Sequence, residues 1–284
     1  MTELLIEVEN ESILSSLRKV LGGMDAQSTT VFLKNLLPNV KFDNPKPINL
    51  MKYIISVTCP PNAIVLDFFS GSATTAQAVL EINEGDQGKR KHIMVQIPES
   101  INDSISNRAG FYTICDIGKA RLKKISEAKL IDSENKRADL SLFNEIPSSK
   151  LDTGFRVLKL DTSNMQDVYY TPESSSKNTL FEDNVKPDRT PEDLLFQVML
   201  ECNIPLSARI ESQKIAGKDV FSVNDGYLLA CFDEDVNETV ITQVAKQKPY
   251  YFIMRDKSLS SDQVADNFEQ IFNAYSKDTI RRIL

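Results

Sequence analysis

The sequence predicts an α/β protein with a parallel, doubly wound sheet in its first half and a second, smaller α/β domain after it. The apolar runs AIVLDFF (63–69) and HIMVQIPE (92–99) have the length and composition of buried strands, and a helical pattern follows each of them. Strand, helix, strand, helix is the order of a parallel sheet with crossover helices. From residue 151 on, strand and helix signals begin again after a polar stretch, which predicts the second domain.

Short helices are expected before the first strand. Ser12 can cap the helix ILSSLRKVL, TTVFLKNLL (29–37) predicts a second one, and the apolar stripe from Ile48 to Ile55 predicts a third that ends before Pro60. After the two strands, helices are expected over 74–81 and 113–129. Both strands are expected to be buried on both faces, as strands of parallel sheets are.

The second half begins with DTGFRVLKLD (152–161), which alternates like a half-buried strand, and a long polar loop is expected over 161–189. Thr190 and Pro191 are typical of a helix start, and Asn237 can cap another helix. The pair Asp225–Gly226 predicts a hairpin turn. A strand over 249–256 and a helix over 261–275 complete the domain.

Composition and charge restrict the functions that the chain can have. The 284 residues carry a formal net charge of −7, which argues against a surface that binds nucleic acid all over. A local basic set is interpreted as a solvated helix face; its members are Lys119, Arg121, Lys123, Lys124, Lys129, Lys136 and Arg137.

The cysteines, the apolar runs and the start of the sequence give expectations about metal binding, membrane spans and location in the cell. Four cysteines without a CxxC pair and one histidine, His92, argue against a zinc site, so we expect reduced thiols and a structural histidine. No apolar run approaches the roughly 18 residues of a membrane span. The acidic start lacks the order of a secretory signal, so we expect a cytoplasmic protein.

The turn after the first strand is rich in polar and small residues. Parallel sheets bind ligands at the carboxyl ends of their strands, and a helix that starts there presents backbone N–H groups. These amides, the flexibility of Gly71 and the nearby hydroxyls suit a carboxylate. Asp67 would repel a phosphate but bind an ammonium group, so the turn suits an amino-acid head group. The residues concerned are Asp67, Ser70, Gly71, Ser72, Thr74 and Thr75.

Other interpretations of this turn remain open at this stage. The sequence has neither the GxxxxGK[ST] loop of phosphate-binding proteins nor the GxGxxG of nicotinamide enzymes. A turn rich in Gly, Ser and Thr can also be a well-capped helix start without a ligand.

The residues DFFSGSATTAQAV resemble the cofactor motif of DNA amino-methyltransferases, which use S-adenosylmethionine. The stretch FDNPKPINLMKYII resembles the family's Lys-Pro motif and its helix, which lies against the methionine end of the cofactor, and the order of the two motifs is that of the β-type enzymes. The resemblance implies that Asp67 binds the ammonium group and that Ser72, Thr74 and Thr75 bind the carboxylate with the turn amides.

The same resemblance assigns roles to other residues. Lys46 and Pro47 would flank the methionine end, and Gln96 or Glu99 after the second strand would approach the ribose or adenine. Phe68 and Phe69 would pack on the cofactor, or equally belong to the core.

Further segments resemble the C-terminal part of the modification subunit of type III restriction–modification systems; they are GFYTICDIGKARLKKI, LDTGFRVLKLDTSN, RTPEDLLFQVML, GYLLACFD and KPYYFIMRD. The resemblance implies a Rossmann-like methyltransferase half over 1–135, a linker over 136–150 and a C-terminal α/β domain over 151–284. It also implies methylation of DNA at N6 of adenine, a homodimer and a restriction subunit as partner.

Two departures from the family matter. Ala73 stands where the family usually has Gly, so its methyl group is expected to cost little affinity while crowding the cofactor. The catalytic Asp-Pro-Pro-Tyr motif is absent, since CPPN at Cys59 and NIPL at Asn203 lack the acid and the aromatic residue. With only 44 residues before Pro45, we expect a cofactor-binding fragment without the catalytic motif and the target-recognition region, inactive alone.

Two alternatives stay open. The chain could be a non-enzymatic assembly or dimerisation module with a relic cofactor pocket, in which the helix over 190–203 carries the contacts. A different Rossmann-like nucleotide binder is the weaker alternative, since both phosphate fingerprints are absent.

Overall fold

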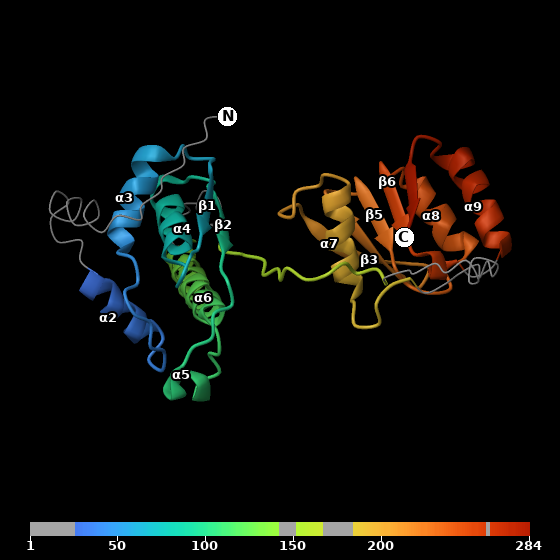
Figure 1. Cartoon of the computed structure of the whole chain (residues 1–284). Coiled ribbons are helices and arrows are strands. Elements are labelled where there is room, and N and C mark those ends of the chain that lie inside the picture. The colour runs from blue at the N-terminus through green and yellow to red at the C-terminus, as the bar shows by residue number, and fades with distance from the viewer. Residues whose placement is uncertain (1–25, 142–151, 167–183, 260–261) are drawn as a thin grey trace. The chain divides into compact units, whose positions relative to one another are not determined.

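The computed structural model describes residues 26–141, 152–166, 184–259 and 262–284, and it divides into two compact units, Met1–Val157 and Leu158–Leu284 (Figure 1). The helix expected after Ser12 lies outside the described residues, as does most of the loop expected over 161–189. The helix that begins at Ile114 continues to Ser141, so it includes the first residues of the predicted linker.

The first unit consists of a parallel pair of strands and helices before, between and after them. The strands are β1 (Ile64–Phe68) and β2 (Lys91–Val95). The helices are α2 (Ala26–Leu36), α3 (Ile48–Thr58), α4 (Thr74–Asp86), α5 (Ser104–Arg108) and α6 (Ile114–Ser141). The predicted order of strand, helix, strand, helix is confirmed, and only the short helix α5 was not predicted.

Helix α4 is the centre of this unit, and every residue from Ser72 to Leu80 is buried. One side of α4 packs through Ala76 and Leu80 against Leu122 of α6. Its other side packs through Val79 against Ile55 of α3. Figure 1 shows α4 beside the two strands, with α3 and α6 next to it. The many small and apolar residues of α4 allow this close contact on several sides.

The prediction that β1 and β2 are buried on both faces is wrong. Exposure alternates along both strands. Val65 and Met94 contact the clusters around α4, whereas Leu66, Phe68 and Ile93 are exposed. The physical reason is that the described residues place helices against one face of this two-stranded sheet.

The second unit contains a five-stranded sheet in the order β3-β4-β5-β6-β7. The strands are β3 (Ile210–Ile215), β4 (Lys218–Val223), β5 (Leu228–Cys231), β6 (Tyr251–Met254) and β7 (Ile280–Ile283). The pairs β3–β4 and β4–β5 are antiparallel, and β5–β6 and β6–β7 are parallel. The helices are α7 (Pro191–Glu201), α8 (Glu238–Lys246) and α9 (Asp262–Tyr275), with a 3₁₀ turn η1 (Asp256–Ser258).

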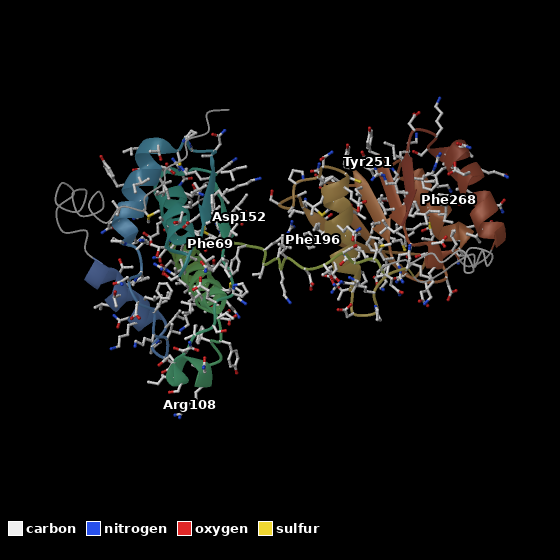
Figure 2. The ribbon with its side chains drawn as sticks, viewed as in Figure 1. Phe69, Arg108, Asp152, Phe196, Tyr251 and Phe268 are labelled. Carbon is white, nitrogen blue, oxygen red and sulfur yellow. The ribbon has the colours of Figure 1, made fainter. Side chains whose placement is uncertain are left out.

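Helices cover both faces of the central strands of this sheet. Leu229 and Phe252 pack with residues of α8 and α9, among them Phe268, which Figure 2 labels. Leu228 and Ile253 pack with the apolar side of α7. That side of α7 consists of Leu194, Leu195, Val198 and Met199, all fully buried. It therefore lies in the core of its own unit and is not an exposed contact surface.

The helix starts and the hairpin turn predicted in the second half are confirmed. Thr190 and Asp193 form a reciprocal capping box at the start of α7. The Asn237 side chain accepts from two backbone N–H groups of α8, and Asp225–Gly226 lies in the turn of the β4–β5 hairpin. These signals are local, so the sequence alone can reveal them.

Long-range pairing explains the elements that prediction missed. The strand expected over 152–161 is wrong, because these residues are irregular and Leu160 is 99% exposed. Strands β3 and β7 were not predicted. Each has a mixed polar sequence, IESQKI and IRRI, and each is a strand because a neighbouring strand pairs with it.

Within the residues described, the four cysteines are free thiols, and Cys202 and Cys231 are buried, as expected of reduced core cysteines. The same residues contain no group of His, Cys, Asp and Glu that could hold a metal ion. No described helix has the length and hydropathy needed to cross a membrane.

Candidate cofactor site

The candidate site is the turn between β1 and α4. Gly71 and Ala73 both have left-handed backbone conformations, with φ of 53° and 59°. A Cβ atom on Gly71 would lie 3.4 Å from the ring of Phe42, so Phe42 packs directly against the turn. Phe42 belongs to the segment that leads into the Lys-Pro pair. This segment therefore lies against the turn, while its predicted contact with the methionine end of the cofactor stays a prediction.

The end of β2 holds the turn from the other side. The backbone N–H of Ser70 donates to the carbonyl oxygen of Val95 at 3.0 Å. The N–H of Gly71 donates to the side-chain oxygen of Gln96 at 2.7 Å. Gln96 therefore fixes the turn directly. Its predicted approach to a ribose or adenine stays a prediction.

Asp67 lies at the carboxyl end of β1 on the half-buried face that points toward α4. Its Oδ2 accepts a hydrogen bond from the Thr75 hydroxyl at 2.5 Å. Thr75 thus uses one of the two carboxylate oxygens of Asp67 and orients the group. The hydroxyl of Thr75 points at Asp67, which ties the strand end to the first turn of α4.

Ser72 and Thr74 are buried, and both hydroxyls accept hydrogen bonds from Arg121 of α6. The Nη1 of Arg121 lies 3.0 Å from Ser72 Oγ and 2.8 Å from Thr74 Oγ1, and it also reaches the Ser72 carbonyl at 3.2 Å. A hydroxyl that accepts from Arg121 retains its own proton to donate. The pair therefore connects a buried guanidinium to the turn.

The position of Arg121 corrects the interpretation of the basic set as a solvated helix face. Arg121 is fully buried, while Lys123 and Lys124 two and three residues further on are exposed. The sequence contained a signal for this. Arg121 lies four residues after Ile117 and four before Ile125, within the stripe that α6 buries.

A chain of polar contacts extends from Arg121 across the unit. Its Nε donates to the Gln77 side-chain oxygen at 2.8 Å, and Gln77 donates to Glu81 at 2.8 Å. Lys52 of α3 donates to the other oxygen of Glu81 at 3.0 Å. Three helices and the turn are therefore joined by one network, called the Arg121 network below.

Within the Arg121 network, one nitrogen of the Arg121 guanidinium has no hydrogen-bond partner among the described residues. Burial lowers the pKa of Arg121 to about 10, with the charge of Glu81 acting in the opposite direction. Among the residues described, its Nη2 is buried without a hydrogen-bond partner. A desolvated positive charge under the turn is stabilised by a nearby anion.

The remaining predicted residues lie at the edge of the site. Pro47 is buried and immediately precedes α3, while Lys46 is exposed. Phe68 and Phe69 are each more than half exposed, and Figure 2 labels Phe69. The structure thus brings together Asp67, the turn and Gln96. It leaves Lys46 and the two phenylalanines at the surface, where a ligand could meet them.

The residues of the turn fit the head group of an amino acid. A half-buried carboxylate suits an ammonium group. The first amides of α4 and the buried guanidinium favour a carboxylate. No phosphate loop is needed for this arrangement, and Asp67 disfavours a phosphate. These residues could hold the ligand class that the sequence predicts, which stays a prediction.

The methyl group of Ala73 lies in the core. Ala73 is 3% exposed and packs with Ala76 and Leu80, facing Gly118 of α6. The expectation that this methyl group crowds the cofactor is therefore not supported by its direction. It fills the space between the turn and α6.

Changing Ala73 to Gly is expected to alter the free energy of unfolding by less than about 1 kcal/mol. Gly adopts the left-handed conformation of residue 73 without the steric cost that Ala has there, which stabilises the folded state. The lost burial of one methyl group and the larger backbone entropy that Gly loses on folding offset this gain. Ala76→Gly is the matched control. This change removes a buried methyl group at a position with ordinary helical backbone angles, so no steric strain is removed with it. It should lower the free energy of unfolding by about 1–2 kcal/mol. Urea denaturation of both variants, followed by circular dichroism, measures this difference; equal losses would contradict the prediction.

Asp116 at the start of α6 should make the stability depend on pH. Burial acts to raise the pKa of Asp116, but hydrogen bonds from Lys119 and from the Thr113 backbone and hydroxyl lower it to about 2. A lowered pKa means that the carboxylate stabilises the fold above about pH 4, and that this stabilisation is lost as the pH falls toward 2. Asp116→Asn should lower the free energy of unfolding by about 1–2 kcal/mol at pH 7 and by much less at pH 2.

Urea denaturation at several pH values between 2 and 7 tests the Asp116 prediction. Asp132→Asn, at an exposed position of the same helix, is the control and should change little. A cost for Asp116→Asn that is the same at pH 2 and pH 7 would rule out the charge as its cause.

Comparison with known proteins shows what the first unit resembles. Residues 25–127, which contain the whole candidate site, match the family described as DNA methylase. The chain is 36% identical over 126 residues to the type III restriction-modification enzyme StyLTI Mod subunit of Salmonella typhimurium, an alignment that covers 44% of this chain and 17% of that subunit.

Two further relatives agree. The chain is 31% identical over 153 residues to a type III restriction-modification enzyme Mod subunit of Escherichia coli, covering 53% of this chain and 23% of that subunit. It is 40% identical over 87 residues to the type II methyltransferase M.KpnI of Klebsiella pneumoniae, covering 30% and 21%. The chain spans less than a quarter of the length of these relatives. The resemblance seen in the sequence is thus confirmed: residues 25–127 match the family described as DNA methylase, and part of the chain is similar to type III Mod subunits.

Proposed function

We propose that the chain is the S-adenosylmethionine-binding part of a type III DNA adenine-N6 methyltransferase with a Rossmann-like fold. The observation that carries the proposal is the turn itself. It joins the Asp67 carboxylate, the start of α4 and a buried guanidinium within a segment that matches DNA methylases. The units would correspond to a methyltransferase part over 1–135, a linker over 136–150 and a C-terminal α/β domain over 151–284.

Each residue of the site has a proposed task. Asp67 binds the ammonium group of the cofactor, held in place by Thr75. Ser72 and Thr74 donate to its carboxylate while they accept from Arg121, and the first amides of α4 donate to the same group.

The outer residues would hold the rest of the cofactor. Lys46 and Pro47 flank its methionine end, Phe68 and Phe69 pack on its apolar surface, and Gln96 borders the ribose or adenine. Ser70 and Gly71 supply the close backbone approach that the turn allows.

The cofactor, when bound, supplies a methyl group on a positively charged sulfur. What the protein adds is position: it holds the methyl donor where an adenine amino nitrogen can approach it in line. The residues that would bind the flipped adenine belong to a catalytic motif that this sequence does not contain. The chain is therefore proposed to be inactive alone.

The partners follow from the same proposal. DNA would be bound by the complete enzyme, as a homodimer, with the restriction subunit of a type III system, and the site of action would be the cytoplasm. The alternative of an assembly module that uses α7 has little support, because the apolar side of α7 is buried within its own unit.

Replacing Asp67 by Asn should weaken the binding of S-adenosylmethionine about 30-fold or more, because the ammonium group loses its charged partner. Asn retains the shape and can still accept from Thr75, so the fold should remain. Calorimetric titration of the full chain measures the affinity. Asp225→Asn, which removes the same charge from a turn in the second unit, is the control and should bind like the parent. Equal affinity of the Asp67 variant would refute its proposed role.

A further inference from the structure

The Arg121 network ends at an ion pair on the surface of the first unit. Lys52 of α3 donates to Glu81 of α4 at 3.0 Å, and the two side chains are 37% and 26% exposed. At its other end the network reaches the hydroxyls of Ser72 and Thr74 through Arg121, which is fully buried. Hydrogen bonds therefore connect the candidate cofactor site with a pair of charges carried by α3 and α4, which Figure 1 shows side by side.

Gln77 is the link between the two ends of the network, and its neighbours fix the direction of its amide group. Gln77 is 3% exposed. Its side-chain oxygen accepts from Arg121 Nε at 2.8 Å, and its Nε2 donates to Glu81 at 2.8 Å. The reversed amide would place its NH2 group against the guanidinium and its oxygen against the carboxylate, so that donors would face donors and acceptors would face acceptors. Since unpaired buried polar groups are unfavourable, the Glu81 carboxylate helps to hold the Gln77 oxygen toward Arg121.

The orientation of Gln77 in turn determines how Arg121 meets the turn. A guanidinium is planar and has donors only, so the acceptor at Nε helps to hold the whole plane. In this plane Nη1 lies 3.0 Å from Ser72 Oγ and 2.8 Å from Thr74 Oγ1. Each hydroxyl accepts from Arg121 and retains its own proton for another acceptor. The hydroxyls are thereby held as donors, which suits a carboxylate and not an ammonium group.

The charge of Glu81 acts in the same sense as its hydrogen bond. The groups that accept hydrogen bonds from Arg121 are neutral: the Gln77 amide, the Ser72 carbonyl and the two hydroxyls. Burial lowers the pKa of Arg121 to about 10, and the charge of Glu81 opposes this shift. A buried charge without a counter-charge is unfavourable, so Glu81 stabilises the guanidinium in its place beneath the turn.

We propose that Glu81, held by Lys52, sets the preference of the turn for a carboxylate. Both are then positioning residues, because they act through Gln77 and Arg121. This inference rests on the proposed function, since the carboxylate concerned is that of S-adenosylmethionine. The ammonium group is bound separately, because Asp67 receives its hydrogen bond from Thr75, outside the Arg121 network. The network should therefore affect one end of the amino-acid head group and leave the other unchanged.

The test compares two ligands that differ by one carboxylate. S-adenosylmethionine and decarboxylated S-adenosylmethionine share the sulfonium, the ammonium group and the adenosine. In calorimetric titration of the full chain, the parent should bind the first ligand at least about tenfold more tightly than the second. Glu81→Met should reduce this preference to about threefold or less, because Gln77 loses its acceptor and the guanidinium loses its counter-charge. Lys52→Met should reduce it by a smaller factor, because Glu81 remains but is no longer held.

The ion pair of Glu84 with Lys129 of α6 supplies the matched control, since Glu84 lies on α4 close to Glu81. Glu84→Met removes the same charge from the same helix but leaves the Arg121 network complete, so the preference should not change. Glu81→Gln is the conservative variant. It can still accept from Gln77 and should retain more of the preference than Glu81→Met does. Because both glutamates are partly exposed, the variants should fold, which circular dichroism checks.

The double variant Arg121→Met with Glu81→Met should have the same preference as Arg121→Met alone, because Glu81 acts through Arg121. A parent that binds both ligands equally, a preference that survives Glu81→Met, or an equal loss of affinity for both ligands would each overturn the inference. In these three cases S-adenosylmethionine still binds the parent, so the proposed function stands. A parent that binds neither ligand would instead remove the proposed function, and the inference with it.

Discussion

Changing Arg121 to Met should lower the free energy of unfolding of the first unit by about 2–4 kcal/mol. Met fills much of the space but cannot donate, so Gln77 and the Ser72 carbonyl lose their partner in a buried environment. Each buried group left unpaired costs roughly 1–3 kcal/mol. Because Ser72 and Thr74 also lose the guanidinium beneath them, the affinity for S-adenosylmethionine should fall at least about tenfold.

Hydrogen exchange of the α4 amides measures the stability change in the first unit, and calorimetric titration measures the affinity. Lys123→Met is the control, because Lys123 is exposed on the same helix and should tolerate the same change. Arg121→Lys separates charge from geometry. It retains the charge, but an ammonium group cannot reproduce the forked contacts to Gln77, Ser72 and Thr74.

Three outcomes are informative. If Arg121→Lys restores affinity, charge beneath the turn is what the cofactor needs. If it restores neither stability nor affinity, the fork of contacts is what matters. If Arg121→Met is as stable as the parent and binds the cofactor equally well, the Arg121 network has no role in holding the turn.

The turn itself could be predicted from the sequence because its determinants are local. A strand, an Asp, a Gly and a helix start follow one another within eleven residues, from Val65 to Thr75. The helix caps at Thr190 and Asn237 are equally local. Such features depend on backbone conformation and on neighbours in the chain, so they can be predicted without knowledge of the fold.

The partners of the turn could not be predicted in the same way. Arg121 lies 49 residues after Ser72 and meets it only because α6 packs against α4. Gln96 reaches Gly71 only because β1 and β2 are neighbours. Which residues meet across such distances depends on tertiary packing, and a basic residue in an apolar stripe was the one available signal.

The sequence also could not show which faces of the two strands are buried. AIVLDFF and HIMVQIPE are mostly apolar, which predicted burial on both faces. The structure buries one face of each strand and leaves the other exposed. Apolar composition favours burial, but which face of a strand is covered depends on where the helices pack. Among the described residues, the helices pack against the Val65 and Met94 side of this sheet.

Changing Gly118 of α6 to Leu should displace the turn between β1 and α4, against which Gly118 packs. A Cβ atom on Gly118 would lie 3.5 Å from both the Ala73 side chain and the Gly71 carbonyl oxygen, which is ordinary contact. The three further carbons of Leu have no room between α6 and the turn, so either the helix or the turn must move. Overpacking of this kind costs about 1–3 kcal/mol. Movement of the turn should lower the affinity for S-adenosylmethionine at least about tenfold.

Two other variants make the Gly118 prediction specific. Gly118→Ala adds only the tolerated Cβ atom and should raise the free energy of unfolding by up to about 1 kcal/mol, because Ala favours a helix. Gly85→Leu makes the same change in α4 at a position where a Cβ atom would have nothing within 4 Å. It should leave both stability and affinity intact. Hydrogen exchange of α4 and α6 together with calorimetric titration distinguishes these cases. If Gly118→Leu binds the cofactor as tightly as Gly118→Ala does, close packing of α6 behind the turn is not required for the site.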